Sequence, residues 1–556
     1  MSTALAVSDI RPGQDVVFTH ELAIINVLIE EYEQESARME AVYKHVWESE
    51  NFPVINKLLH YNARPGETPN QGMPGSVNMD YVRGRLRADY WRRVTNMTNV
   101  LLLMPEKRRD EWREQFINGM GTVEKPPYDP GGPVRKVKEY VGVPEFSRST
   151  VVPTLMGMLN DRHKYLVERV HGIFKRLSPR HKTNRSFGFS EKMIMANVIT
   201  DFWGSSVTCS SFMEDTVDDL RVLLQILHHR TCLSSVVRLG NVLSAVYRGN
   251  KEAFGEWFFI DGGLINMRFY KNGNVHLQVH PDVAWQLNEL LSYALPGAIP
   301  AEFRTKSSRP APREFQIIEK TIPESVRMSL RDVKEFKKTG KYSGAGGAQS
   351  EEMAKILTMI GGHSDGYFWM FPYEPESVFD YLISRGTIPD TLTHQFYPSP
   401  APVAEFVAEV TEYTPGMSLL EPEAGRGDLL AFLDVDPFDV TAIELNGLLV
   451  SVLEAKGFAN VLCRDFLDWS AANPDVLFDR IVMNPPFSEG RWKLHCQTAM
   501  HHLKPKGRLV AVLPGRPDLA QLIGTANVVG VHGRTFENEF EGTGVTVTVC
   551  VFQRFK

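Results

Sequence analysis

The stretch Arg480-Ile481-Val482-Met483-Asn484-Pro485-Pro486-Phe487 indicates how the carboxyl-terminal part of the chain folds. The apolar run ending at Met483 predicts a buried strand of a parallel sheet, and the next four residues follow it where such sheets bind their ligands. This turn offers carbonyl oxygens from residues that lack a backbone N–H, an amide side chain and an aromatic ring. An amine on a planar ring fits this set, because two acceptors can take its hydrogens and Phe487 can stack on its face.

Strand and helix patterns alternate from about residue 392 to the end of the chain. Short apolar runs are separated by helix-length segments, which is typical of a doubly wound parallel sheet. The runs are Met417–Leu420, Val440–Ile443, Val461–Leu462, Ile481–Met483 and Leu509–Leu513. The terminal run over 545–552 alternates like a strand and is expected to pair antiparallel at the far side of the sheet. We therefore predict an α/β domain over 392–556 with a mostly parallel, Rossmann-like sheet and an antiparallel last strand.

A glycine-containing turn follows the first of these strands, in Glu421-Pro422-Glu423-Ala424-Gly425-Arg426-Gly427-Asp428-Leu429-Leu430. Gly425 and Gly427 allow the backbone to approach a ligand closely, and Glu421 can receive an ammonium group. Glycine turns that bind nothing are common, and the third glycine of a dinucleotide fingerprint is missing. The turn by itself leaves a cofactor site and a plain loop equally open.

Two further acids follow the second and third strands. Glu444 lies 19 residues after Gly425, where a carboxylate can accept both ribose hydroxyls of a nucleoside cofactor. Asp465 follows the third strand and can take the amine of the cofactor's adenine. Either acid can instead cap a helix or lie in a loop, but three acids at successive strand ends favour a nucleoside site.

The end of the fourth strand carries residues suited to chemistry on an amine. The amine of adenine is a weak nucleophile because its lone pair is delocalised into the ring. Hydrogen bonds to the Asn484 side chain and the Pro485 carbonyl favour a tetrahedral nitrogen whose lone pair points at a methyl donor. Phe487 can stack on the base once it has left its helix. This chemistry requires no metal or strong base; the alternative is a proline turn that only caps the strand.

Residues 394–556 resemble the class I S-adenosylmethionine-dependent DNA adenine-N6 methyltransferases. Glu421–Leu430 resembles their cofactor motif and Asn484–Phe487 their catalytic Asp/Asn-Pro-Pro-aromatic motif, in the order called gamma. Phe396–Pro400 resembles the segment beside the cofactor's methionine end, and Phe540–Thr546 resembles the terminal hairpin of phage-type members.

The resemblance implies the residues of the site. The catalytic residues would be Asn484, Pro485, Pro486 and Phe487. The cofactor, S-adenosyl-L-methionine, would lie against Tyr397, Pro398, Ser399, Glu421, Pro422, Ala424, Gly425, Gly427, Glu444, Asp465, Phe466 and Asn484. Glu423 and Arg426 depart from the small residues that are more often found in the glycine turn.

The resemblance also implies a substrate, the exocyclic N6 amine of adenine in double-stranded DNA, with the base flipped out of the helix. No endonuclease signature is present, which favours an orphan phage or mobile-element enzyme that protects DNA from restriction. Two alternatives stay open. The first is a methyltransferase with another substrate, because the same tetrad accepts the amine of RNA adenine or the amide of a protein glutamine. The second is a non-catalytic protein that binds DNA or a host protein and carries a vestigial methyltransferase domain.

The amino-terminal part differs in pattern. Residues 1–300 are mainly of helical period, with a small β-meander predicted near 256–280, and 301–391 indicate a linker and connecting α/β segment. Within that segment we expect a buried strand over Tyr367–Phe371 and a helix near Pro375–Arg385. From about 80 to 300 the chain resembles an uncharacterised domain of unknown function found in phage, plasmid and genomic-island proteins. The matching stretches are Tyr90–Arg93, Val170–Phe174, Leu177-Ser178, His181–Asn184 and Lys271–Leu277.

A basic helix is the candidate nucleic-acid contact, because little sequence follows the catalytic motif. Arg162, Arg169 and Arg176 recur every seven residues beside an apolar face. Residues 162–192 hold nine Lys or Arg against two acids, which predicts a surface that follows phosphates. The following loop would extend this surface with Arg180, Lys182 and Arg185. An ordinary solvated helix face is the alternative.

Composition sets the remaining expectations. The 556 residues are 43% hydrophobic and 23% charged, as in globular proteins of several domains, and the net charge of −6 excludes a uniformly basic DNA coat. There is no signal peptide and no 18-residue apolar run, so we expect a cytoplasmic protein without a membrane anchor. The resemblance to phage enzymes implies that this is the cytoplasm of a bacterial host. Five scattered cysteines and no clustered histidines predict reduced thiols and no metal. The sequence indicates no oligomeric state.

Overall fold

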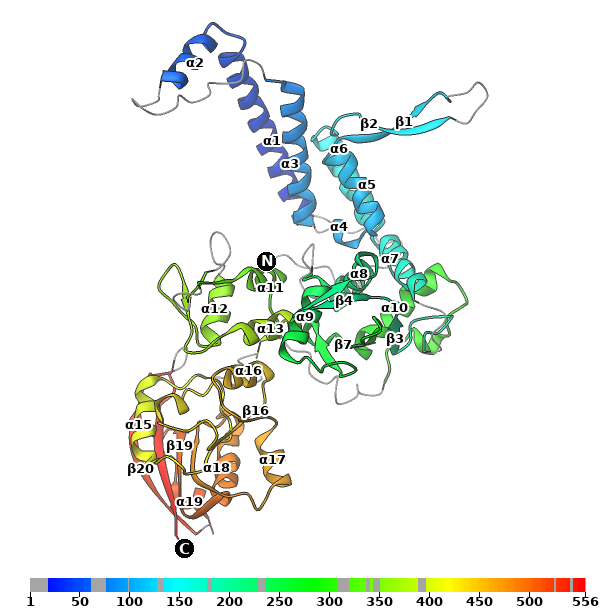
Figure 1. The fold of residues 1–556 in the computed structure, drawn as a ribbon. Helices are drawn as coiled ribbons and strands as arrows, with labels where there is room; N and C mark the ends of the chain where they lie inside the picture. Colours follow the sequence, from blue (N-terminus) through cyan, green and yellow to red (C-terminus); the bar gives the residue numbers. More distant parts are fainter. Residues whose placement is uncertain are drawn as a thin grey trace. The chain divides into compact units, whose positions relative to one another are not determined.

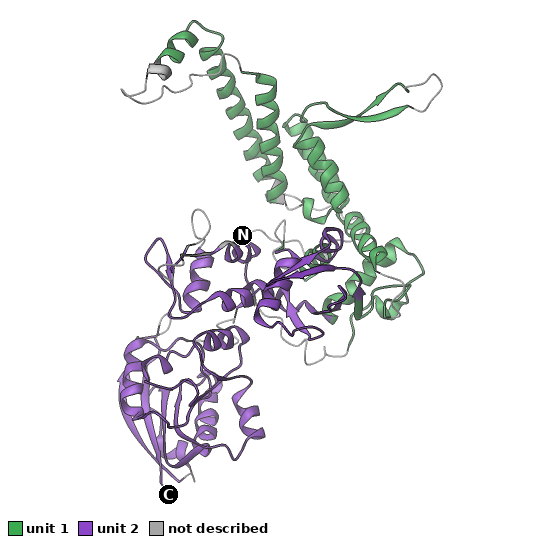
Figure 2. Cartoon of the chain, in the orientation of Figure 1, with its two compact units in different colours: residues 1–193, 218–236, 281–308 green, residues 194–217, 237–280, 309–556 purple. Residues whose placement is uncertain are grey.

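The computed structural model describes residues 19–61, 77–98, 100–127, 134–177, 183–228, 236–308, 320–336, 341–343, 351–388, 397–524, 527–540 and 544–555 (Figure 1). The chain divides into two compact units, green and purple in Figure 2. Unit 1 comprises residues 1–193, 218–236 and 281–308, and unit 2 comprises residues 194–217, 237–280 and 309–556.

Unit 2 contains a seven-stranded sheet in the order β17-β16-β15-β18-β19-β21-β20. The strands are β15 (Leu419–Glu421), β16 (Val440–Glu444), β17 (Asn460–Cys463), β18 (Phe478–Met483), β19 (Leu503–Pro514), β20 (Val528–Phe536) and β21 (Val547–Arg554). Strands β15 to β19 pair in parallel, whereas β21 runs antiparallel to both of its neighbours. The predicted α/β domain with a mostly parallel sheet and an antiparallel last strand is confirmed.

Helices cover both faces of this sheet, shown in yellow to red in Figure 1. They are α15 (Ala401–Thr411), η5 (Leu430–Phe432), α16 (Gly447–Ala455), α17 (Phe466–Ala472), η6 (Ser488–Gly490), α18 (Arg491–His501) and α19 (Leu519–Ile523). Successive strand residues point to opposite faces, so Leu419 joins a core with Val403 of α15, while Leu420 joins another with Phe466 and Cys496. Two buried faces explain why these strands are continuous apolar runs.

Two features of the sheet differ from the expectation. The sequence pattern does not indicate β20, because Gly530 and Gly533 interrupt its apolar alternation. The last strand, β21, lies one position in from the edge, between β19 and β20. The sheet therefore ends in a strand that sequence alone does not reveal.

The rest of unit 2 consists of short strands and helices. They are β4 (Ile199–Trp203), β5 (Ser206–Cys209), α9 (Leu239–Gly249), β6 (Phe258–Ile260), η2 (Asp261–Gly263), β7 (Ile265–Phe269), β8 (Val275–Val279), β9 (Lys320–Thr321), α11 (Glu324–Asp332), β10 (Lys334–Phe336), β11 (Lys341–Ser343), α12 (Glu351–Met359), β12 (His363–Ser364), β13 (Trp369–Met370), α13 (Glu376–Arg385) and β14 (Thr387–Ile388). The meander predicted near 256–280 is β6-β7-β8, and the predicted helix near Pro375–Arg385 is α13. The strand expected over Tyr367–Phe371 is only β13, and Tyr367 is 83% exposed at the hairpin tip.

Helix α13 joins the meander region to the seven-stranded sheet. Arg248 of α9 forms a bidentate ion pair with Asp380 of α13, with N···O distances of 2.7 and 2.5 Å. On another side, Tyr381 of α13 packs on Gly447 at the start of α16, where a Cβ would lie 2.5 Å from the tyrosine hydroxyl. The pair of Arg248 and Asp380 joins 237–280 to the residues after 309, and both segments belong to unit 2. The two units therefore do not follow the predicted boundaries at residues 300 and 391.

Unit 1 is mainly helical. Its elements are α1 (Thr19–Val46), α2 (Phe52–Tyr61), α3 (Met79–Thr98), α4 (Val100–Leu103), α5 (Glu106–Phe116), β1 (Met120–Lys125), β2 (Arg135–Tyr140), α6 (Arg148–Asn160), α7 (Arg162–Arg176), α10 (Pro281–Ala294) and η3 (Ala301–Phe303); β3 (Lys192–Met195) and α8 (Ser211–Leu227) cross its boundaries. Its core centres on Trp91, which is fully buried against Trp112 and Phe146 and donates to the Pro144 carbonyl at 3.0 Å. Burial of this indole therefore holds α3, α5 and the segment before α6 together.

Across the described residues, no helix is long and apolar enough to cross a membrane. Over the same residues, no three His, Cys, Asp or Glu side chains are grouped so that they could hold a metal ion.

Asp479 ties the starts of three sheet strands together. Its carboxylate accepts hydrogen bonds from Ser418 N at 2.9 Å, Ser418 Oγ at 2.7 Å and Lys504 Nζ at 2.7 Å. Partial burial by itself raises the pKa of Asp479, but the hydrogen bonds from Lys504 and Ser418 outweigh it and lower the pKa from 3.8 to about 2.

A depressed pKa predicts how Asp479→Asn changes stability with pH. The charged carboxylate stabilises the folded chain fully above its ordinary pKa, and this contribution is lost as pH falls toward about 2. We expect the variant to unfold at lower urea concentration at neutral pH, with the difference from wild type shrinking below about pH 4. Urea midpoints measured at about pH 7, 5 and 3 test this; a difference that stays constant would contradict it.

Candidate functional site

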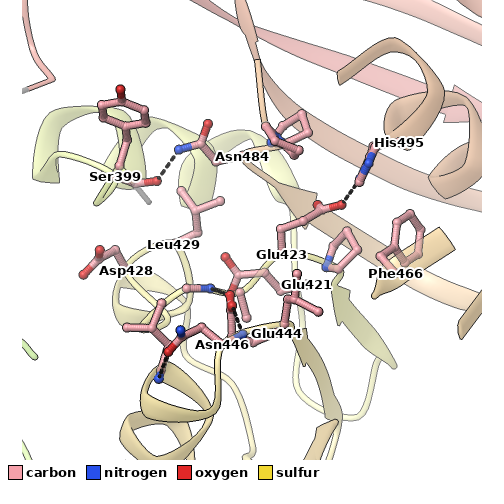
Figure 3. Close-up of a pocket in the computed structure, with 18 of the residues that line it drawn as sticks. Ser399, Glu421, Glu423, Asp428, Leu429, Glu444, Asn446, Phe466, Asn484 and His495 are labelled. Carbon is pink, nitrogen blue, oxygen red and sulfur yellow. Dashed lines mark hydrogen bonds and ion pairs between the residues drawn. The ribbon is translucent and has the colours of Figure 1, made fainter. Parts of the chain in front are cut away.

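A cavity of about 440 Å³ opens at the carboxyl ends of the central strands of the sheet. The chain proceeds from β15 outward to β16 and β17, then returns to the other side of β15 as β18, so the strand order reverses there. Ligands of doubly wound sheets bind at such a reversal. Figure 3 shows side chains from the ends of these strands converging on the cavity.

The structure brings nearly all of the predicted catalytic and cofactor-binding residues together around this cavity. Those that line it are Tyr397, Pro398, Ser399, Glu421, Pro422, Ala424, Gly425, Glu444, Asp465, Phe466, Asn484, Pro485, Pro486 and Phe487. Gly427 is the exception. Its φ is +78°, and a Cβ there would lie 2.9 Å from Cδ2 of Leu453, so this glycine lets the turn pack on α16 rather than lining the cavity.

Glu421 ends β15 with a buried carboxyl group. Its Oε2 has no hydrogen-bond partner among the described residues. Burial raises the pKa of Glu421 well above its ordinary value, and the nearby Asp428 raises it further, whereas Lys456 lowers it. A buried carboxylate oxygen without a donor is costly, so the position favours a ligand that brings a donor or a positive charge.

Glu444 ends β16 and fixes the glycine turn. Its two oxygens accept hydrogen bonds from Gly425 N at 2.8 Å and Asn446 N at 2.7 Å. Burial raises the pKa of Glu444, while these two backbone N–H groups lower it. Asn446 in turn caps α16, accepting from Leu448 N at 2.9 Å. The carboxylate is thereby held in one position at the cavity wall, and each of its oxygens retains capacity for a second hydrogen bond.

Asp465 caps a helix, which was the alternative to a cofactor role, and it also lies at the cavity. Its Oδ1 caps α17 by accepting from Leu467 N at 2.8 Å and Asp468 N at 3.0 Å. Its side chain also lines the cavity, next to the buried ring of Phe466. Because the cap uses Oδ1, Oδ2 is available for a ligand.

Asn484 follows β18 with a free acceptor. Its Nδ2 donates to Ser399 Oγ at 3.1 Å, and no described residue donates to its Oδ1 or to the Pro485 carbonyl oxygen. Pro485 is buried and Phe487 is half-buried against the core on the α15 face of the sheet. The ring of Phe487 is therefore less exposed than expected, but it still lines the cavity beside the two acceptors.

Glu423 and His495 form a pair that the sequence does not reveal. Nδ1 of His495, on α18, lies 2.5 Å from Oε1 of Glu423, and both side chains line the cavity (Figure 3). Burial raises the pKa of Glu423, and His495 lowers it. The two residues lie 72 positions apart, so only an acid at a position that usually holds a small residue hinted at this pair.

Arg426, the second departure in the glycine turn, also lines the cavity, but its guanidinium is bonded to other parts of the protein. Its Nε donates to Asp428 at 2.8 Å, and its Nη1 donates to the Thr358 carbonyl at 2.9 Å, at the end of α12. The backbone oxygen of Arg426 accepts from Lys456 Nζ at 2.5 Å. The arginine thus fastens the turn to the neighbouring segment of unit 2.

The predicted phosphate-binding edge of α7 is not exposed as expected. Arg162 is buried, and Arg169 is 2% exposed, with its Nε donating to Asp219 at 2.7 Å. Arg169 is turned inward because the partly buried Asp219 offers a partner that the sequence pattern does not reveal. Arg176 is exposed, and Arg185 lies over the ring of Phe303, 4.4 Å from its centroid. Arg180 and Lys182 lie outside the described residues.

Comparison with known families identifies one segment of the chain. A family described as a domain of unknown function (DUF4942) matches residues 134–296, within the stretch for which the sequence suggested such a domain. Among curated proteins, none matches this chain.

Solved structures similar to parts of the chain include three methyltransferase-related proteins. A candidate class I S-adenosylmethionine-dependent methyltransferase from Listeria monocytogenes is 16% identical over 29% of this chain and 62% of its own, with a TM-score of 0.24. A candidate RNA methyltransferase from Pyrococcus horikoshii is 20% identical over 30% and 89%, with a TM-score of 0.25. The modification subunit of a candidate type I restriction enzyme from Vibrio vulnificus is 17% identical over 38% and 59%, with a TM-score of 0.24. This chain thus spans less than two thirds of the Listeria and Vibrio chains.

Proposed function

We propose that this chain is an S-adenosylmethionine-dependent methyltransferase that modifies the exocyclic N6 amine of adenine in DNA. In this proposal it is an orphan enzyme of a phage or mobile element that protects DNA from restriction. The observation that carries the proposal is a pair of acceptors, Asn484 Oδ1 and the Pro485 carbonyl, that no described residue uses, on a cavity that also holds Glu421 Oε2 without a described partner.

The residues present fit the proposed cofactor. The buried Glu421 oxygen without a donor suits an ammonium group. Glu444, fixed by two backbone N–H groups, suits a pair of ribose hydroxyls, and Asp465 beside Phe466 suits an adenine amine and ring. Gly425, with φ of +55°, lets the backbone pass close to the ligand. When bound, S-adenosylmethionine supplies a methyl group on a positively charged sulfur.

The residues at the end of β18 would act on the target amine. Asn484 and Pro485 each accept one hydrogen bond from it, which favours a tetrahedral nitrogen whose lone pair is released from the ring. Ser399 fixes the amide of Asn484 so that its oxygen faces the amine. Phe487 offers a ring face on which a flipped base can stack, which offsets part of the unstacking cost.

Expression of the full chain in a host without adenine methylation of its own tests this function. We expect N6-methyladenine in genomic DNA digested to nucleosides, and none above background when Asn484→Ala is expressed at the same level. The same cells provide RNA nucleosides and protein hydrolysates, in which methyladenine and methylglutamine are measured by mass spectrometry.

Each result separates one candidate function from the others. Methyladenine in DNA that depends on Asn484 supports the proposal. Methylation found only in RNA or only on protein glutamine would overturn the DNA substrate and retain the methyltransferase. Absence of any Asn484-dependent methylation, together with no heat of binding for S-adenosylmethionine in calorimetry, would favour a vestigial domain.

A further inference from the structure

The cavity holds a second acid, Glu423, which the proposed reaction does not use. Its side chain is 19% exposed, and its Oε1 is occupied by His495 Nδ1 at 2.5 Å. The other oxygen, Oε2, is buried and has no hydrogen-bond partner among the described residues. Glu421, two residues earlier, shares this condition, so the glycine turn presents two incompletely satisfied carboxyl groups to one cavity.

His495 holds Glu423 in a fixed position. The imidazole is itself 6% exposed, and its ring lies against Phe466, with the ring centroids 6.1 Å apart. A side chain enclosed in this way has few alternative rotamers, so the carboxylate bonded to it stays at the cavity wall. Asp465 is the other charged group that acts on Glu423, and it adds negative charge rather than neutralising it.

The charges of the cofactor and of its product explain what a second acid can do. S-adenosylmethionine carries two positive groups, an ammonium and a sulfonium, whereas S-adenosylhomocysteine keeps the ammonium and has a neutral thioether. One carboxylate at Glu421 is sufficient for the group that both molecules share. A second fixed negative charge in the same partly enclosed cavity would favour the molecule with the second positive charge.

We infer that Glu423, positioned by His495, is a specificity-determining residue that favours the sulfonium cofactor over its neutral thioether product. The inference rests on the proposed function and adds a mechanism by which the spent cofactor leaves. Loss of the positive charge at sulfur removes the attraction to Glu423, so the product is bound less tightly than the cofactor that replaces it.

Calorimetric titration of the purified full chain with three ligands tests the inference. The ligands are S-adenosylmethionine, S-adenosylhomocysteine and sinefungin, in which an amine-bearing carbon replaces the sulfonium. We expect Glu423→Gln to weaken S-adenosylmethionine and sinefungin about tenfold and S-adenosylhomocysteine less than about threefold. Glu423→Ser, which restores the small side chain usual in this turn, should change the three affinities in the same way as Glu423→Gln. Glu409→Gln removes one exposed charge from the same domain and is the matched control.

The outcomes distinguish a failure of this inference from a failure of the proposed methyltransferase function. If wild type binds both natural ligands and the Glu423 variants leave the ratio of their affinities unchanged, the inference is overturned while the methyltransferase proposal stands. If wild type binds none of the three ligands, the proposed function itself fails. Unchanged stoichiometry for S-adenosylhomocysteine shows that each variant is folded, so a selective loss of the cationic ligands reports on charge.

Discussion

Replacing Asn484 with alanine is expected to lower the turnover of methyl transfer by roughly 10²–10³-fold, the usual effect of removing one preorganised hydrogen-bonding group from a reacting centre. The amide oxygen has no donor among the described residues in the absence of substrate, so its hydrogen bond forms only with the target amine. Loss of an interaction that is strongest in the transition state lowers kcat and kcat/KM together, and we expect the affinity for cofactor to stay nearly unchanged. Initial rates with labelled cofactor, combined with calorimetry, measure both quantities.

Two variants make this experiment specific. Asn484→Asp keeps an acceptor oxygen for the amine but replaces the donor to Ser399 with a charged acceptor, so we expect it to retain more activity than Asn484→Ala. Asn460→Ala removes an exposed amide at the start of β17, far along the strand from the cavity, and should behave as wild type. A rate for Asn484→Ala within about threefold of wild type would show that the tetrad does not act on the amine.

The sequence predicts which residues meet at the cavity, because the backbone of the parallel strands determines their positions. Glu421, Glu444 and Asn484 lie at or directly after the ends of β15, β16 and β18, and parallel strands end at one edge of a sheet. Their convergence therefore follows from identifying the strands. The pair of Glu423 and His495 depends instead on how α18 is rotated over the sheet, which no local pattern determines.

Helical periodicity predicted the buried apolar face of α7 but not the burial of its arginines. Leu166, Val170 and Ile173 are buried, as the pattern predicts. Arg169 lies on the border of that face, and periodicity cannot decide whether a neighbouring element supplies a carboxylate. Asp219, 50 residues further along the chain, supplies it, so Arg169 forms a partly buried ion pair instead of the expected phosphate contact.

Another buried arginine, Arg327 of α11, connects three segments of unit 2. It is 1% exposed and donates from Nη1 to Asp261 at 3.0 Å and to Glu324 at 2.5 Å. Its Nε and Nη2 donate to the Ile383 carbonyl, at the end of α13, at 3.1 and 2.5 Å. Gly386, with φ of +69°, leaves room for the guanidinium, since a Cβ there would lie 2.9 Å from its Cζ.

Arg327→Met is expected to destabilise this region by about 3–5 kcal/mol, because it leaves Asp261 and Glu324 buried without their cation. Helix α13 packs on both α9 and α16, so its amide protons report the loss directly. In hydrogen exchange followed by mass spectrometry, we expect protection of α11 and α13 to fall by roughly 10²–10³-fold or to the limit set by global unfolding. Arg331→Met, an exposed change on the same helix, is the matched control.

A second variant shows whether the destabilisation of Arg327→Met comes from unpaired carboxylates or from lost side-chain packing. If unpaired carboxylates cause it, adding Asp261→Asn to Arg327→Met should recover part of the protection, because the second change removes a buried charge that no longer has a partner. Lost side-chain contacts would not be restored by an amide at position 261, so unchanged exchange in the double variant would assign the cost to packing. Exchange protection in Arg327→Met equal to that of wild type would contradict the prediction. It would mean that apolar contacts alone hold α11, η2 and α13 together.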